Sequence, residues 1–141
     1  MDKTDIKIIN LLQEDGRMSI KDIASQVNLT SPAVSERIRR LEDGGIIEGY
    51  HAEINPLKTG KSIIAFVSVD VNPKLREGFV EFCENNKHIK EHYHIIGPYN
   101  ALLKVVAEGS DELTALLGNI QVFGVTQTSI VLESVFKFKA E

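Results

Sequence analysis

The sequence predicts an α+β protein in which three short helices precede a βαββαβ series of strands and helices. Apolar residues recur at helical spacing up to about Leu41, and alternating, β-branched segments appear after it. Turn-forming residues at Gly44-Gly45 and Asn55-Pro56 separate the two patterns. The chain has 141 residues, 43% hydrophobic and 26% charged, which allows a real core and excludes a disordered protein.

Each of the first three helices has sequence signals at its ends. Asp2 and Asp5 suit the start of the first helix, because their charge complements a helix N-terminus, and Asp15-Gly16 ends it. Ser19 and Thr30 are expected to cap the second and third helices. The expected buried faces are Ile6, Ile9 and Leu12 in the first helix, Ile20, Ile23, Ala24 and Val27 in the second, and Val34, Ile38 and Leu41 in the third.

The segment after these helices divides the chain into domains. Residues 46–54 alternate around Gly49, which favours a small hairpin or an extended wing. Asn55-Pro56 and Gly60 mark a connector. We therefore expect a first domain at residues 1–55, a linker at 56–61 and a second domain at 62–141.

The second domain has the pattern of four strands and two helices. Strands are expected at residues 62–70, 89–96, 101–107 and 126–138, and helical stripes at Leu75, Phe79, Phe82 and Cys83 and at Leu113, Leu116, Leu117 and Ile120. Two βαβ units of this kind usually close as a ferredoxin-like sandwich, an antiparallel sheet with both helices on one face. Apolar residues on both sides of several strands leave the other face uncovered, so we expect a homodimer.

The first domain has the form of a winged helix-turn-helix. A three-residue turn joins its second and third helices, and in such motifs the second motif helix lies in the DNA major groove. Turning Val34, Ile38 and Leu41 inward leaves an arginine-bearing side facing outward. The residues expected to contact DNA are Thr30, Ser31, Pro32, Ser35, Glu36, Arg37, Arg39 and Arg40.

These side chains have the chemistry that DNA recognition needs. Arginine donates two parallel bonds to a guanine edge or clamps a phosphate, and short hydroxyls contact phosphates or bases. The alternative for Arg39 and Arg40 is that they only lie on the solvated side of an amphipathic helix and contact no DNA. Two roles are open for Arg37, which either binds a phosphate or pairs with a carboxylate. Three roles are open for Glu36: it accepts a hydrogen bond from cytosine, it repels phosphates, or it is only a solvated charge.

Positive charge is local in this chain. The 16 basic and 20 acidic residues give a net charge of −4, which argues against a protein that coats nucleic acid through its overall charge. Residues 30–41 carry three arginines against Glu36, a local charge of +2. Any contact with double-stranded DNA is therefore expected to centre on this helix.

Other residues give weaker signals. His88, His92 and His94 surround the second strand, where a metal site would need further ligands and a pH-sensitive oligomer contact is the alternative. Cys83 belongs to an apolar stripe, which favours packing. The chain has no glycine-rich phosphate loop, nucleophile elbow or paired catalytic carboxylates, so we expect neither an enzyme nor a bound cofactor or metal. Without a membrane-spanning run or a secretory segment, a cytoplasmic location is expected.

Several segments together resemble one protein family, the Lrp/AsnC (leucine-responsive, or feast/famine) transcription regulators. The resemblance covers essentially the whole chain. Its segments are Asp5-Ile6-Lys7-Ile8-Ile9, Asp15-Gly16-Arg17, Asp22-Ile23-Ala24, Leu29-Thr30-Ser31-Pro32-Ala33-Val34, Arg37-Ile38-Arg39-Arg40-Leu41-Glu42, Gly45-Ile46-Ile47-Glu48-Gly49-Tyr50, Gly97-Pro98-Tyr99-Asn100 and Gly124-Val125-Thr126-Gln127-Thr128.

The resemblance implies a sequence-specific regulator whose C-terminal domain dimerises, often assembles into tetramers or octamers, and commonly binds an amino acid between neighbouring dimers. By that analogy the effector contacts are Gly97, Pro98, Tyr99, Asn100, Thr126 and Thr128. The family's loop commonly ends in Asp where this chain has Asn100, and Pro98 replaces a residue with a backbone N–H. A neutral amide lacks the charge-assisted bond that a carboxylate makes to an ammonium group, and both residues also suit a plain turn.

Two other functions remain open at the level of sequence. One is an architectural DNA-binding protein that needs no effector. The other is a small-molecule-binding or enzymatic ferredoxin-like domain whose helical module serves protein contacts, since fold alone does not decide function.

Overall fold

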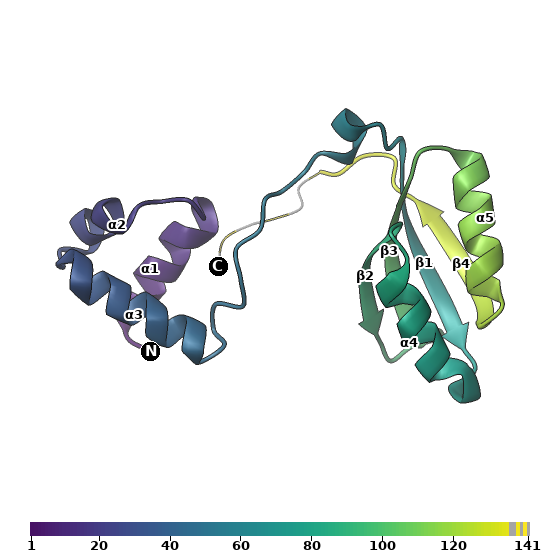
Figure 1. Cartoon of the computed structure of the whole chain (residues 1–141), viewed down its shortest axis with the longest axis horizontal. Coiled ribbons are helices and arrows are strands. Elements are labelled where there is room, and N and C mark those ends of the chain that lie inside the picture. Colours follow the sequence, from purple (N-terminus) through teal and green to yellow (C-terminus); the bar gives the residue numbers. More distant parts are fainter. Residues whose placement is uncertain (136–137, 139, 141) are drawn as a thin grey trace. The chain divides into compact units, whose positions relative to one another are not determined.

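The computed structural model describes residues 1–135, 138 and 140 and contains two compact units, Met1–Glu53 and Ile54–Val135 (Figure 1). The first unit consists of the helices α1 (Lys3–Glu14), α2 (Ile20–Val27) and α3 (Ser31–Asp43). The second unit contains the sheet with two α-helices. Each unit has its own apolar core.

The starts of the three helices follow the sequence signals. At α1, the Asp2 carboxylate accepts from the Asp5 amide and the Asp5 carboxylate accepts from the Asp2 amide, each at 2.9 Å. The Ser19 hydroxyl accepts from the backbone of α2, and the Thr30 hydroxyl accepts from the Ala33 amide in α3. The predicted caps at Ser19 and Thr30 are therefore confirmed.

The core of the first unit differs from expectation at one position. Ile8 is fully buried, whereas Ile6 has 46% of its surface exposed. The expected inward position of Ile6 is wrong, because the α1 stripe that meets the other helices runs through Ile8, Ile9 and Leu12. The fully or nearly buried residues of this unit are Ile8, Ile23, Ala24, Val34, Ile38 and Leu41.

The segment after α3 takes the extended form of the two that the sequence allowed. Gly45 adopts a φ of 71°, and the amides of Ile46 and Ile47 both donate to the Leu41 carbonyl, at 2.9 and 3.0 Å. Ile47 then packs on the helical core. Residues 46–54, all of which the structure describes, contain no strand, so the expected alternative of a hairpin is wrong.

The second unit is a ferredoxin-like sandwich, as predicted. Its elements are the 3₁₀ helix η1 (Pro56–Thr59), β1 (Ile63–Val71), the 3₁₀ helix η2 (Pro73–Leu75), α4 (Arg76–Asn85), β2 (Ile89–His94), β3 (Ala101–Ala107), α5 (Ser110–Gln121) and β4 (Gly124–Ile130). The strands form one antiparallel sheet in the order β2-β3-β1-β4. Helices α4 and α5 lie on the same face of it (Figure 1).

The core of this unit lies between the sheet and the two helices. Every second residue of β1 is buried there, from Ala65 to Val71, and β3 alternates in step because Val67 pairs with Leu103. Helix α4 contributes Phe79 and Cys83, and α5 contributes Leu113, Leu116 and Ile120.

The last strand is shorter than the sequence predicts. β4 ends at Ile130, and the amide of Val131 makes one further bond to the Ile64 carbonyl. Residues 131–135 form no strand, so the expected strand over 126–138 is wrong there; positions 136 and 137 lie outside the described residues. The β1–β4 ladder stops at the Ala65–Ile130 pair, and β1 itself begins at Ile63, so in this register no β1 backbone lies opposite residues beyond 132.

The sheet face turned away from the helices also carries apolar side chains. The strand alternation places Ile64 and Phe66 of β1 on this face, together with Leu102 and Val106 of β3 and Val125 of β4. Phe66 and Val125 have 38% and 70% of their surface exposed. The expectation of apolar residues on both sheet faces is thus confirmed.

Candidate nucleic-acid interface

Helix α3 presents one buried and one exposed side. Val34, Ile38 and Leu41 are 0%, 7% and 4% exposed and hold the helix on the core of the first unit. The opposite side carries Arg39 and Arg40, whose side chains are 62% and 73% exposed. The structure therefore brings the predicted arginine pair together on the outer surface of this helix.

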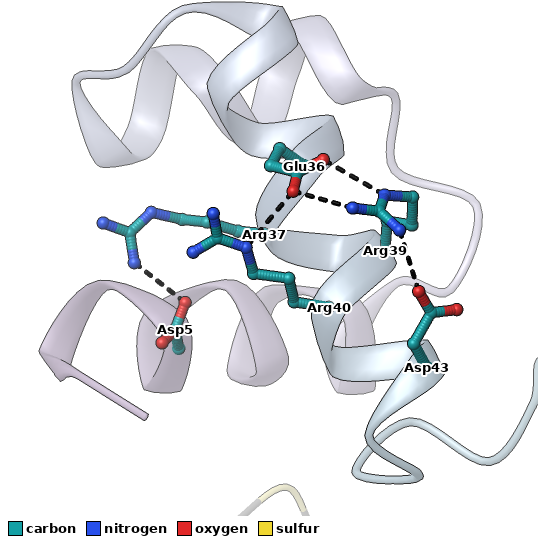
Figure 2. A network of polar contacts seen from close by, with 6 residues as sticks. All are labelled: Asp5, Glu36, Arg37, Arg39, Arg40 and Asp43. Atoms are coloured by element: carbon teal, nitrogen blue, oxygen red, sulfur yellow. Dashed lines mark hydrogen bonds and ion pairs between the residues drawn. The ribbon is translucent and has the colours of Figure 1, made fainter.

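A single carboxylate connects those two arginines (Figure 2). Glu36 accepts from Arg39 through both oxygens, with Nε–Oε2 at 3.1 Å and Nη2–Oε1 at 2.8 Å. Its Oε1 atom also accepts from Nε of Arg40 at 3.2 Å. Arg39 makes a further bond from Nη1 to Oδ2 of Asp43 at 2.9 Å. Both arginines therefore have internal acceptors in the free protein.

Glu36 and Arg39 stay charged around neutral pH. The hydrogen bond from Arg39 lowers the pKa of the Glu36 carboxyl, and the bond to Glu36 raises the pKa of Arg39. Over residues 31–43, three arginines are matched by Glu36, Glu42 and Asp43. The local excess of positive charge over residues 30–41 is thus offset at the end of the helix.

Arg37 points to a different partner. Its Nη1 atom donates to Asp2 at 2.7 Å and to Asp5 at 2.9 Å, and its side chain is only 29% exposed. The two acceptors are the residues that form the capping box of α1. Of the two roles that the sequence left open for Arg37, the structure supplies the carboxylate pair, and this pair joins α3 to the start of α1.

The short hydroxyls of the motif lie at the start of α3. Thr30 Oγ1 accepts from the Ala33 amide at 3.3 Å and so fixes where the helix begins. Ser31, Pro32 and Ser35 are exposed along the first turn and a half. The sequence-predicted residues therefore share one outer surface, apart from Arg37, which is turned toward α1.

The loop between β2 and β3 contains the expected effector residues Gly97, Pro98, Tyr99 and Asn100. The Asn100 side chain accepts from the Val71 amide at 2.8 Å and donates to the Val71 carbonyl at 2.9 Å. The backbone amide of Asn100 also donates to the Val69 carbonyl. Sequence reasoning missed this pairing, because the partner lies 29 residues away.

The remaining expected effector residues, Thr126 and Thr128, lie on β4. They pair with Val69 and Val67 and therefore face the helices, where the Thr126 hydroxyl accepts from Nε2 of Gln121 at 3.3 Å. Within the part of one chain that the structure describes, no hydrogen bond joins these threonines to the loop.

The histidines of the second unit are separated by their partners. His92 packs edge-on against Phe79 with ring centroids 5.1 Å apart, His94 Nδ1 lies 3.0 Å from Arg76, and His88 lies 2.9 Å from Glu112. Among the described residues, no three His, Cys, Asp or Glu side chains are arranged to hold a metal ion. Burial raises the pKa of the Cys83 thiol to about 12.

Helix length also bears on membrane insertion. In the described ranges, no helix has the combination of length and apolar sequence needed to cross a bilayer.

Comparison with known families decides the assignment of the two units. The winged helix-turn-helix DNA-binding family matches residues 1–48, and the Lrp/AsnC ligand binding domain matches residues 64–140. The chain belongs to the Lrp/AsnC family. It is a DNA-binding transcriptional regulator with a ligand-binding domain, as the sequence resemblance implied.

Individual members of the Lrp/AsnC family match along almost their whole length. The regulator YezC of Bacillus subtilis is 34% identical over 95% of each chain. The leucine-responsive regulatory protein of Escherichia coli is 34% identical over 96% of this chain and 87% of its own. Among solved structures, LrpC of B. subtilis superposes with a TM-score of 0.91 at 27% identity, covering 98% of this chain and 99% of its own.

Proposed function

We propose that this Lrp/AsnC regulator reads DNA with the outer side of α3, in which Arg39 and Arg40 make the main contacts. The observation that carries the proposal is the exposed arginine pair on a helix whose other side is fixed in the core. Glu36 and the hydroxyls of Thr30, Ser31 and Ser35, with Pro32, complete the contact surface. Arg37 acts mainly by positioning α3 through Asp2 and Asp5.

The test is a binding titration at several salt concentrations. The DNA is a duplex that the wild-type protein selects from a random library. Replacing Arg39 and Arg40 by Ala should lower affinity by more than about tenfold and reduce the salt dependence, because fewer counterions are released. The control, Lys74→Ala with Lys87→Ala, removes the same charge from the second unit. Equal affinity of the arginine variant and this control would show that α3 is not the reading helix.

We also propose how the chain is divided and assembled. Residues 1–55 form the DNA-binding domain, 56–61 the linker and 62–141 the dimerisation and effector domain. The apolar face of the sheet, with Phe66 exposed and Ile64 and Leu102 half-buried, supports a homodimer, because burying these side chains removes their surface from water. Such a dimer presents two α3 helices to a pseudo-palindromic site in the cytoplasm, and further contacts build tetramers or octamers.

Light scattering after gel filtration tests the dimer. Phe66→Glu places a charge in the centre of the proposed interface and should yield monomers. Ala115→Glu, on the exposed side of α5, is the control and should leave the mass unchanged. A wild-type protein that runs as a monomer, or a Phe66→Glu variant with the wild-type mass, would rule out this interface.

We further propose that the loop of Gly97, Pro98, Tyr99 and Asn100, with Thr126 and Thr128 of a neighbouring dimer, binds an amino acid. The ligand-binding family match over residues 64–140 and the 34% identity to a leucine-responsive regulator support this proposal. Binding alters DNA occupancy to the extent that one assembly state holds the effector more tightly.

Calorimetric titration with each standard amino acid tests the effector. At least one should bind, and Thr126→Val with Thr128→Val should weaken it, because both hydroxyls are lost while the side-chain shape is kept. Thr114→Val on α5 is the matched control. A protein that binds none of them, and whose DNA affinity responds to none, would instead be an architectural DNA-binding protein.

A further inference from the structure

The hydrogen bonds of Glu36 to Arg39 and Arg40 also affect how α3 would bind DNA. Among the contacts of α3, three of the four hydrogen bonds from Arg39 and Arg40 end on this one carboxylate, and the fourth ends on Asp43 (Figure 2). The Glu36 side chain is 44% exposed and lies on the same outer side as the arginines. A group that binds both arginines competes directly with any phosphate that approaches them.

We infer that Glu36 is a specificity-determining residue that withholds Arg39 and Arg40 from DNA lacking the correct base beside it. The inference rests on the proposed function of α3. In the free protein the carboxylate accepts hydrogen bonds from both guanidinium groups. On DNA, phosphates or guanine edges must replace it, and the carboxylate is left facing a negatively charged surface.

The free energies involved indicate that Glu36 weakens binding to incorrect DNA without preventing DNA binding altogether. Ion pairs between exposed side chains contribute little free energy, so a dense array of phosphates displaces them readily. The larger cost is the uncompensated carboxylate, which is repelled by phosphates and partly stripped of water. That cost is offset when a cytosine presents its N4 amino group to Glu36, because a carboxylate accepts that bond directly. Random DNA offers this donor at a given position only about one time in four, because it is one of four distinguishable base pairs.

Helix α3 contains a matched pair of controls. Glu42 is exposed on the same helix, and none of the arginine contacts on α3 ends on it. Glu42→Gln therefore removes the same charge as Glu36→Gln without releasing an arginine. Asp43 accepts one hydrogen bond from Arg39, so Asp43→Asn removes one of the three bonds of Arg39 on α3 and leaves its two bonds to Glu36 in place.

The experiment measures the affinity of the full chain for two duplexes, the selected site and a scrambled duplex of equal length. Glu36→Gln should bind the scrambled duplex roughly fivefold more tightly than Glu42→Gln does, with a steeper salt dependence. The affinity of Glu36→Gln for the selected site should increase less, so the ratio of its affinity for the selected site to its affinity for the scrambled duplex falls. Asp43→Asn should lie between the two variants.

A coupled measurement separates the possible failures. In the background of Arg39→Ala with Arg40→Ala, the advantage of Glu36→Gln over Glu42→Gln should become smaller, because no arginine is left to release and only the repulsion between Glu36 and phosphates remains. If the arginine substitutions weaken DNA binding but Glu36→Gln equals Glu42→Gln in the wild-type background, the role of Glu36 is wrong and the reading helix stands. If the arginine substitutions change nothing, the proposed function itself fails.

Discussion

The side-chain amide of Asn100 pairs with both backbone polar groups of Val71, accepting from its N–H at 2.8 Å and donating to its C=O at 2.9 Å. This pair fixes the end of the β2–β3 loop to the end of β1. An amide side chain both donates and accepts in this geometry, whereas an ionised carboxylate is an acceptor alone. The Asn that departs from the family's usual Asp therefore has a structural use.

Asn100→Asp should consequently destabilise the second unit. The substitution keeps the bond from the Val71 amide but leaves the Val71 carbonyl facing a carboxylate oxygen. We expect the free energy of unfolding to fall by about 1–2 kcal/mol in urea titrations at neutral pH. The exposed Asn119 of α5 gives a control, Asn119→Asp, which should cost no more than a few tenths of a kcal/mol, about the size of an unfavourable helix-end charge. Equal stability of the two variants would contradict the pairing.

The bond between Arg37 and Asp2 predicts a pH-dependent stability. The Arg37 hydrogen bond, together with that of the Asp5 amide, lowers the pKa of Asp2 from 3.8 to about 2. A carboxyl whose pKa is lower in the folded state stabilises the fold above its unfolded value and loses this effect as pH falls toward its folded value.

The matching variant is Asp2→Asn, which still caps α1 but has no charge. The stability difference between wild type and this variant should be constant near neutral pH and shrink between pH 3.8 and about 2. Thermal unfolding of both proteins across this range measures the difference. A difference that stays the same down to pH 2 would mean that Asp2 acts only as a cap.

Arg37 itself should affect DNA binding without contributing a phosphate contact. Arg37→Gln loosens α3 from α1, so the affinity for the selected duplex should fall, while the slope of log affinity against log salt stays at the wild-type value. Arg39→Gln should lower that slope by about 0.9 if it removes one phosphate contact. A comparable drop in slope for Arg37→Gln would assign Arg37 to the DNA surface instead.

The parts of the structure that the sequence predicted are those set by nearby residues. Thr30, Pro32 and the spacing of Val34, Ile38 and Leu41 define the start and the buried side of α3 within 12 residues, and the structure follows them. Capping and amphipathic periodicity are local effects, so a single sequence contains them.

The errors and omissions come from distant partners. Alternation continues to Phe138 in the sequence, yet β4 ends at Ile130, and β1 begins at Ile63 and so has no backbone opposite residues beyond 132. Arg37 meets Asp2 and Asp5 across 35 and 32 residues. The acidic start of α1 was a visible signal, but only the packing of α1 against α3 selects Arg37 as its partner.

His92 predicts a loss of stability at mildly acidic pH. Burial, then the charges of Arg76 and His94, lower its pKa below the ordinary 6.5, and Glu84 opposes this shift. The unfolded chain therefore binds a proton more readily than the folded chain, so stability declines as pH drops below about 6.5. His92→Leu keeps an apolar contact with Phe79 and should reduce this decline in calorimetric scans. An unchanged pH profile would contradict the assignment to His92.

The junction of β4 with β1 should be intolerant of any side chain at Gly124. A Cβ atom there would collide with the backbone carbonyl of Asp70, and a backbone atom has no rotamer by which to move away. Gly124→Ala should therefore lower the free energy of unfolding by about 2–3 kcal/mol. Gly118 of α5 is the matched control, since a Cβ there meets open space, and Gly118→Ala should raise stability by about 0.5–1 kcal/mol through better helix propensity. Urea titrations that place both variants on the same side of wild type would show that the start of β4 adjusts freely, and with it the placement of Thr126.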